Sequence, residues 1–179
     1  MNSERNYQWD AADYAQHSSE QFKWACELTE KLALRGHETV LDIGCGDGKV
    51  TALIAAQLTN GRVVGIDSSP QMIELAARHQ VKAGCPDLMF KLLDVRDLEY
   101  VEWFDVVFSN AVLHWIKEHL QMLQRVRKAL KKGGRLLFQM GGRGNAHAIL
   151  GVLDELLKTT KWSPFFFRFP LSLWILRCR

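Results

Sequence analysis

From residue 39 onward, short apolar runs alternate with longer segments in which apolar residues recur at helical spacing. Several of the short runs are apolar at nearly every position, which is typical of strands buried on both faces of a sheet. Alternating strands and helices predict an α/β fold, a doubly wound and mostly parallel sheet with helices on both faces. The expected strands are residues 39–43, 62–66, 88–93, 104–108 and 135–140.

The intervening segments carry apolar stripes, as amphipathic helices do. We expect the helix that precedes the fifth strand to end at Gly133-Gly134. Another helix is expected to begin at Ser68-Ser69-Pro70, where serine caps the first turn and proline suits it. Further helices are expected over residues 20–34 and 146–159. The stripes expected to face inward are Phe22, Ala25, Leu28 and Leu32; Val50, Leu53, Ile54 and Leu58; Met72, Leu75, Ala76 and His79; Ile116, Leu120, Leu123, Val126 and Leu130; and Ile149, Val152, Leu153 and Leu156.

The composition is ordinary for a soluble globular protein, with 47% hydrophobic and 24% charged residues in 179. This length suits one domain. The net charge of +3, without a long basic run, favours neither nucleic acid nor an anionic membrane as a partner. The apolar run over residues 165–176 is interrupted by Arg168 and Pro170 and is too short to span a bilayer as a helix.

The four cysteines are widely spaced and form no Cys-x-x-Cys pair. We therefore expect no zinc site and no disulfide framework, and the N-terminus has no signal-peptide core. The histidines other than His114 have no partners at metal-ligand spacing, so no metal is expected. A reducing, cytoplasmic location is the expectation.

A glycine-rich turn, Gly44-Cys45-Gly46-Asp47-Gly48, follows the first expected strand. Glycines allow a sharp bend and bring backbone N–H groups against a ligand, while the next helix directs its positive end to the same place. Asp67 ends the second strand, where an acid can accept hydrogen bonds from both ribose hydroxyls of a nucleoside. The alternative is that the glycines only pack the helix against the strand.

The spacing of this turn separates two ligands. A dinucleotide turn usually reads G-x-G-x-x-G, whereas this one reads G-x-G-x-G with Asp42 two residues before it. Acids at Asp42 and Asp47 suit a pyrophosphate poorly. They suit an amino-acid group, because an acid can help to hold its ammonium while backbone N–H groups take its carboxylate.

The residues around this turn resemble motif I of the class I S-adenosylmethionine-dependent methyltransferases, over residues 40–48. Residues 65–73, 93–95, 104–115 and 130–136 resemble further motifs of that family. The resemblance runs from about residue 7 to residue 160 and implies S-adenosylmethionine as the cofactor. It is greatest to the trans-aconitate and malonyl-carrier O-methyltransferase group, through residues 9–19 and the pair His114-Trp115. The cofactor-binding residues that it and the turn indicate are Asp42, Gly44, Cys45, Gly46, Gly48, Asp67, Ser68, Met72, Asp94, Val95, Asn110, Tyr14 and Gln16.

This resemblance implies a small-molecule methyl acceptor, with a carboxylate as the first candidate and an amine, thiol or hydroxyl left open. A carboxylate is already nucleophilic, so a catalytic base is optional. His114 is the candidate base, although a histidine that only shapes the pocket is the preferred interpretation. Trp115 lines the pocket or simply packs, and Asn110 is a site residue or a turn residue. The oligomeric state is left open.

The end of the chain departs from the family pattern, in which a further helix and two antiparallel strands follow the fifth strand. Only 20 residues follow Thr159. We therefore divide the chain into a methyltransferase domain over residues 1–160 and an atypical hydrophobic tail over 161–179. We also expect the last two strands to be absent, by truncation or a frame shift, and the fifth strand to have an unpaired edge. The missing strands favour one alternative to an active methyltransferase, a cofactor-binding remnant without catalysis. A nicotinamide-dependent oxidoreductase is a further alternative, against which the glycine spacing, Asp42 and Asp94 count.

Overall fold

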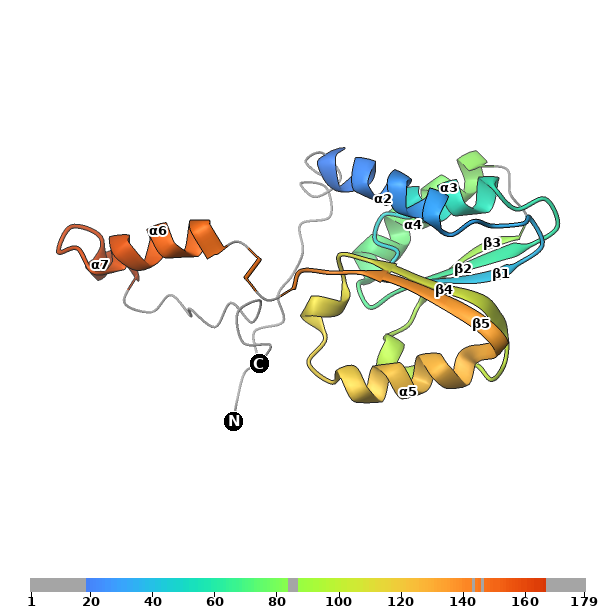
Figure 1. The fold of residues 1–179 in the computed structure, drawn as a ribbon. Coiled ribbons are helices and arrows are strands. Elements are labelled where there is room, and N and C mark those ends of the chain that lie inside the picture. Colours follow the sequence, from blue (N-terminus) through green and yellow to red (C-terminus); the bar gives the residue numbers. More distant parts are fainter. Residues whose placement is uncertain (1–18, 84–86, 143, 146, 167–179) are drawn as a thin grey trace.

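A computed structural model describes residues 19–83, 87–142, 144–145 and 147–166. Strands and helices alternate along the chain from β1 to β5, and two helices follow β5 (Figure 1). The elements are α2 (Ser19–Lys31), β1 (Thr39–Ile43), α3 (Lys49–Ala56), β2 (Arg62–Asp67), α4 (Pro70–Ala83), β3 (Leu88–Leu92), η1 (Val95–Asp97), β4 (Phe104–Asn110), η2 (Leu113–Trp115), α5 (His119–Ala129), β5 (Leu130–Gln139), α6 (His147–Leu157) and α7 (Ser163–Phe166).

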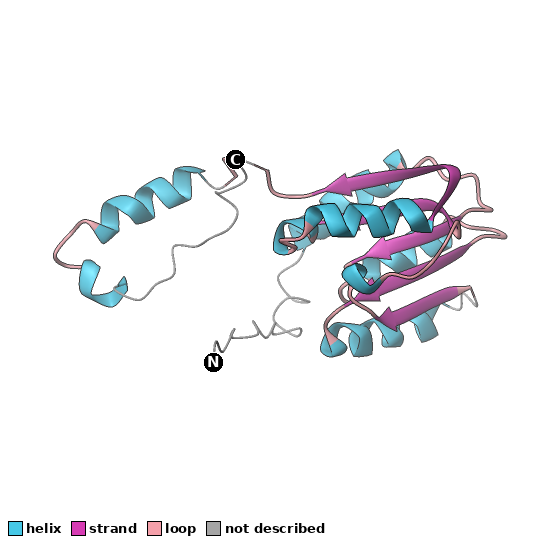
Figure 2. Cartoon of the chain, turned by 90° about the horizontal axis from the view of Figure 1, so that it is seen from below, coloured by secondary structure: helices cyan, strands magenta, loops and turns pink. Residues whose placement is uncertain are grey.

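The five strands form one sheet in the order β3-β2-β1-β4-β5, and every pair is parallel (Figure 2). The doubly wound α/β prediction is confirmed. The chain fills one half of the sheet with β1, β2 and β3 and then crosses to β4. Because the strand order reverses between β1 and β4, the crevice beyond the carboxyl ends of these strands is the expected place for a ligand.

Alternate residues of the central strands pack on opposite faces of the sheet, as the two-residue strand period requires. Leu41 and Ile43 join the core on the side of α5, and Val40 joins the core on the side of α2 and α3. Figure 1 shows α2, α3 and α4 over one face and α5 over the other. The near-continuous apolar runs are therefore explained by burial on both faces.

Helix α5 buries only part of the expected stripe, because Val126 and Leu130, directly after the helix, are buried but two of its leucines are not. Met122, Val126 and Ala129 lie against the sheet, whereas Leu120 is 72% exposed and Leu123 is 43% exposed. The stop signal was also wrong, because α5 ends at Ala129 and the glycine pair 133–134 lies inside β5. Gly133 has φ +79°, and the ladder between β4 and β5 shifts register near it. The two glycines therefore lie in an irregular first part of β5.

The other expected boundaries are close to those observed. Strand β1 matches over its whole length, and Ser69 caps α4 by accepting the Met72 N–H group at 3.4 Å. Strands β2 and β4 are longer than expected by one and two residues, and β3 is shorter by one. Strand β5 covers 130–139 instead of 135–140.

Helix α6 lies apart from the sheet in both views (Figures 1 and 2). The inward stripe expected for it is not buried, since Ile149 is 73% exposed and Val152 is 63% exposed. In the described part of the chain, β5 pairs with β4 alone and no element of the sheet layers covers α6. The expected absence of the last two strands stays a prediction, whereas the expected packing of α6 is wrong. No described helix combines the length and apolar character needed to cross a bilayer.

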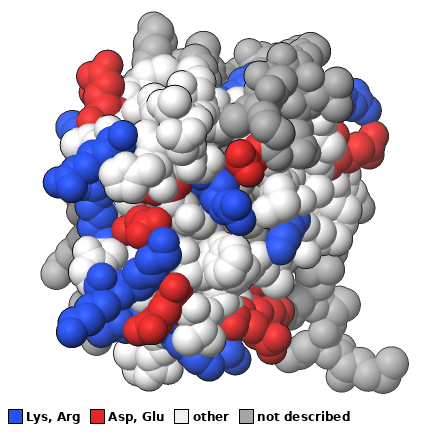
Figure 3. Space-filling model, turned by 90° about the vertical axis from the view of Figure 1, so that its right-hand side faces the viewer, with Lys and Arg blue, Asp and Glu red and all other residues white. Residues whose placement is uncertain are grey.

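Acidic and basic side chains are interspersed on the side of the molecule where the strands begin (Figure 3). Lys131 and Asp105 form an ion pair of 2.7 Å there, and Arg135 lies 3.8 Å from Glu38. The electrostatic potential of this face is therefore not dominated by charge of one sign. The crevice described next lies at the opposite end of the sheet.

Candidate cofactor and acceptor site

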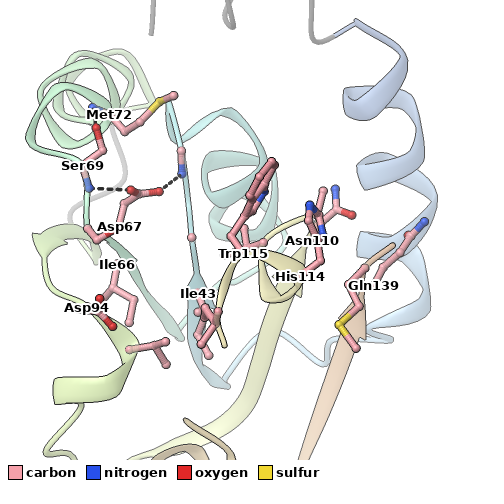
Figure 4. Close-up of a pocket in the computed structure, with 18 of the residues that line it drawn as sticks. Ile43, Ile66, Asp67, Ser69, Met72, Asp94, Asn110, His114, Trp115 and Gln139 are labelled. Atoms are coloured by element: carbon pink, nitrogen blue, oxygen red, sulfur yellow. Dashed lines mark hydrogen bonds between the residues drawn. The ribbon is translucent and has the colours of Figure 1, made fainter. Parts of the chain in front are cut away.

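A cleft of about 810 Å³ lies beyond the carboxyl ends of β1, β2, β4 and β5. Its volume is within the range that ligand sites occupy. Figure 4 shows two groups of side chains in it, with Asp67, Ser69 and Met72 on one side and His114 and Gln139 on the other. One side of the cleft therefore has polar groups suited to a nucleoside, and the opposite side leaves room for a second molecule.

The glycine turn is held to the neighbouring strand at its first residues. The N–H groups of Gly44 and Cys45 both donate to the Ile66 carbonyl, at 2.8 and 3.0 Å. Gly44 has φ +70°, and a Cβ there would lie 2.3 Å from the side chain of Val112. Glycine is therefore required at this position both by the backbone conformation and by the close approach of the segment after β4.

Two other glycines of the turn have different functions. Gly46 lines the cleft with φ +55°, and a Cβ built on it would meet nothing within 4 Å. Gly48 does not line the cleft, and a Cβ there would lie 2.6 Å from Phe90 and 2.9 Å from Ala76. The packing interpretation is thus correct for Gly48, while the open space at Gly46 fits a backbone cradle for a ligand.

Asp67 joins the glycine turn to the turn after β2. Its Oδ2 accepts the Gly46 N–H group at 3.0 Å, and its Oδ1 accepts the Ser69 N–H group at 2.8 Å (Figure 4). A carboxylate has about four acceptor positions, so each oxygen keeps one for a ligand. Two acceptors on one carboxylate fit the two hydroxyls of a ribose. Burial raises the pKa of Asp67 although its backbone hydrogen bonds favour the charged form.

Asp42 lies behind the cleft and not on its wall. Its side chain is buried between β1 and α3, where Oδ2 accepts the Thr51 hydroxyl at 2.7 Å. Burial raises the pKa of Asp42 to about 7. The structure thus contradicts the expectation that Asp42 touches the ammonium of a ligand, because alternation along β1 turns the side chain toward the helix.

Cys45 and Asp47 are also turned away from the cleft. Burial raises the pKa of the Cys45 thiol, so it stays protonated and packs as a small apolar side chain. Asp47 pairs with Lys49 at 2.7 Å. Within the glycine turn, the structure therefore places only Gly44 and Gly46 on the cleft wall.

Asp94 lies at the end of the segment after β3 and caps η1. Arg96 holds it with three hydrogen bonds, from the main-chain N–H group and Nε to Oδ1 (2.9 and 3.0 Å) and from Nη2 to Oδ2 (2.6 Å). The guanidinium lowers the pKa of Asp94 and keeps it ionised. Three of about four acceptor positions are occupied, which leaves one on Oδ2 for a ligand donor.

The opposite side of the cleft is built from the ends of β4 and β5. Asn110 and Gln139 are partners in the ladder, and both line the cleft. His114 follows in η2, and its ring centre lies 5.0 Å from that of Trp115. Partial burial lowers the pKa of His114, so the ring is neutral at neutral pH. This side offers uncharged polar groups and aromatic surface.

Most of the expected cofactor residues do line the cleft, namely Gly44, Gly46, Asp67, Ser68, Met72, Asp94, Val95 and Asn110. Tyr14 and Gln16 lie outside the described residues. The sequence interpretation missed Trp24, Arg96 and Gln139. Gln139 could have been found, because it ends the fifth strand at the ligand edge of the sheet. Trp24 and Arg96 carried no comparable signal.

Comparison with known proteins agrees with this geometry. Residues 34–164, more than half of the chain, match a family model described as a methyltransferase domain. The chain belongs to the S-adenosylmethionine-dependent methyltransferases. Membership confirms the family resemblance, the fold and the cofactor expected from the sequence.

Curated relatives include trans-aconitate 2-methyltransferases of two bacteria. The Methylobacterium radiotolerans protein is 36% identical over 132 residues, which are 74% of this chain and 49% of that protein. The Escherichia coli protein is 34% identical and covers 74% of this chain and 50% of its own length. The chain thus spans about half the length of the curated relatives it matches.

Solved structures share the fold. The YcgJ protein of Bacillus subtilis has a TM-score of 0.64 at 18% identity, over 82% of this chain and 67% of that one. A phosphoethanolamine N-methyltransferase of Haemonchus contortus, solved with S-adenosylhomocysteine, has a TM-score of 0.65 at 24% identity, over 75% and 32%. These similarities support the architecture of the sheet.

Proposed function

We propose that this chain forms the cofactor-binding part of a methyltransferase that acts on a small molecule, with a carboxylate as the acceptor. The observation that carries the proposal is the Asp67 carboxylate, which bridges the turns after β1 and β2 and keeps one acceptor position on each oxygen. The open space at Gly46 lies beside it. Together they fit a nucleoside whose remaining part extends along the glycine turn.

The residues present fit S-adenosylmethionine. Asp67 would hold the ribose, Asp94 would accept the adenine amino group at the free position of Oδ2, and Met72 would lie against the base. When bound, the cofactor supplies an electrophilic methyl group, whose carbon accepts a lone pair of the acceptor while the carbon–sulfur electron pair stays on sulfur. Since a carboxylate has no proton to lose, the chain needs only to position it and exclude water.

The side of the cleft formed by the ends of β4 and β5 suits a small methyl acceptor that carries oxygen atoms. Asn110, His114 and Gln139 provide neutral polar groups there, and Trp24 and Trp115 provide apolar surface. The trans-aconitate methyltransferases among the relatives favour a carboxylate. A small-molecule acceptor and a cytoplasmic location remain predictions, as do the division at residue 160 and the expectation that no nucleic acid or membrane takes part.

A cofactor-binding remnant without catalysis is the second candidate. It is favoured by the unpaired edge of β5 and the exposed apolar face of α6 in the described residues. A nicotinamide-dependent oxidoreductase fits less well, because the turn reads G-x-G-x-G and the chain belongs to the methyltransferases.

Two measurements together test the proposal. Calorimetric titration with S-adenosylhomocysteine and with NADH should give saturable binding of the first alone. Transfer of a labelled methyl group to a panel of small carboxylic acids, including trans-aconitate, and to matched amines and alcohols should label the acids. Binding without transfer would favour the remnant, and saturable binding of NADH alone would overturn the proposal.

A further inference from the structure

His114 is linked to the end of the neighbouring strand through one ring nitrogen. The Gly141 N–H group points at Nδ1 across 3.5 Å. Gly141 follows β5 and His114 follows β4, so the ring spans the ends of two adjacent strands beside the cleft. The half-buried His114 side chain lines the cleft, and no hydrogen bond to its Nε2 is found among the described residues.

This contact selects one tautomer of the neutral ring. A histidine that accepts an N–H group at Nδ1 must carry its proton on Nε2, because a proton on Nδ1 would face the Gly141 proton head-on. The selection holds even at 3.5 Å, since two N–H dipoles that point at each other repel. The nitrogen that is free to meet a ligand is therefore a donor.

The turn that carries His114 is fixed from behind. The Leu113 side chain is 2% exposed, and the Leu113 carbonyl accepts Nε2 of His119 at 2.8 Å. The ring of Trp115 lies 5.0 Å from the His114 ring at 48°. Because core packing and the first residue of α5 hold η2, the His114 ring is set in place before any ligand arrives.

We infer that His114 presents its Nε2–H group to the methyl acceptor as a hydrogen-bond donor, and that it selects an acceptor with a carboxylate or carbonyl oxygen. It does not remove a proton from the acceptor. This role rests on the proposed methyl transfer and specifies the acceptor side of that site. A donor of this kind suits a carboxylate acceptor. One carboxylate oxygen accepts the Nε2–H group, and the other stays available to receive the methyl group.

A hydrogen-bond donor and a general base at His114 differ in their dependence on pH. An imidazolium still carries an Nε2–H group, although its new Nδ1 proton opposes the Gly141 N–H group. Protonation of His114 therefore keeps a donor, whereas it would remove a general base. Other charged groups of the same cleft are present in both the native protein and a His114 variant, so comparing the two profiles isolates His114. These groups are Asp67, Asp94, Arg96, Lys117 and Glu118.

The first test reads the tautomer directly and needs no turnover. Nitrogen NMR of ring-labelled histidine in the intact chain should show His114 protonated on Nε2 at neutral pH. His114→Gln assigns the signal by removing it. A proton on Nδ1 would overturn the inference, whatever the outcome of the transfer assays.

The second test uses the acid labelled best in the panel. Glutamine places an amide N–H group near the position of Nε2, whereas asparagine is shorter and places it near Nδ1. We expect His114→Asn and His114→Ala to lower kcat/KM about 10- to 100-fold below His114→Gln, the scale of a hydrogen bond to a charged group. His147→Gln, at the exposed start of α6, is the matched control.

The two interpretations of His114 give opposite results. If His114 is a hydrogen-bond donor, the dependence of kcat/KM on pH should have the same shape below neutral pH in the native protein and in His114→Gln. A general base predicts equal losses in all three variants and a native rate that falls tenfold per pH unit below the pKa of His114. If no acid is labelled, the methyl-transfer proposal fails, and the NMR measurement still decides the tautomer.

Discussion

Arg96 holds Asp94 by three hydrogen bonds and extends its remaining arm to Glu118, 3.2 Å away at the start of α5. The guanidinium thus joins the loop after β3 to the segment that follows η2. It leaves one acceptor position of Asp94 free and fixes its direction, so we propose that Arg96 positions Asp94 for the base of the cofactor.

Replacing Arg96 by methionine is therefore expected to weaken binding of S-adenosylhomocysteine about tenfold, the scale of one oriented hydrogen bond. Calorimetric titration measures the change. Arg78→Met removes an exposed ion pair of 2.9 Å with Glu74 on α4 and should leave the affinity unchanged. Equal affinities for both variants would show that Asp94 needs no orientation by Arg96.

Two glycines of the same turn should respond in different ways. Gly44→Ala places a methyl group 2.3 Å from Val112 and should lower both the melting temperature and the affinity for S-adenosylhomocysteine. Gly46→Ala meets no protein atom within 4 Å, so its stability cost is limited to the left-handed backbone, about 1 kcal/mol. It should nevertheless weaken ligand binding, because the new methyl group enters the cleft. Thermal unfolding and titration of both variants test this contrast, and Val112→Ala should restore part of the stability lost in Gly44→Ala.

Asp67→Asn should weaken S-adenosylhomocysteine binding by about 1–3 kcal/mol, since the amide leaves polar partners unpaired. Burial raises the pKa of Asp67, and the ribose hydroxyls need the ionised form. Native affinity should therefore rise with pH through that raised pKa, while the affinity of the variant should not. Asp97→Asn, at an exposed position of η1, is the control. Unchanged affinity in Asp67→Asn would place the ribose elsewhere.

Asp42 should make the unliganded protein lose stability as pH rises. The carboxyl has a pKa of about 7 when folded, against a usual value of 3.8, so between about pH 4 and pH 7 the folded state holds a proton that the unfolded state has lost. The free energy of unfolding of the native protein should therefore decrease relative to that of Asp42→Asn as pH rises across this window, on the order of 1 kcal/mol per pH unit. Urea unfolding at several pH values measures it, and a difference that does not change with pH would contradict the burial of this carboxyl.

Much of the fold could be predicted because parallel strands buried on both faces leave a direct mark on the sequence. Val40, Leu41 and Ile43 make the run 39–43 mostly apolar, and β1 has these bounds. Helix faces were harder, because α5 carries two nearly equivalent apolar stripes. Leu120 and Leu123 continue the pattern as well as Met122 does, and only the position of the sheet decides which of the three is buried.

The candidate site divides in a similar way. Gly46 and Asp67 were predicted from spacing alone, because the carboxyl ends of adjacent parallel strands meet at one edge and a turn there needs glycine. Asp42 is close to the glycine turn in sequence, but strand alternation turns its side chain to Thr51 and away from the cleft wall. Arg96 has no sequence signature, since its partners become neighbours only when the loops after β3 and β4 meet.

By itself, the sequence determined the order of the strands and helices along the chain, the glycine turn and the acid at the end of the second strand, because each depends on local spacing. Tertiary structure decided which helix faces are buried, which acids reach the cleft and which nitrogen of His114 carries the proton. The last depends on the Gly141 N–H group, 27 residues away in the chain and 3.5 Å away in space. Such contacts form only when strand ends meet, so no local pattern encodes them.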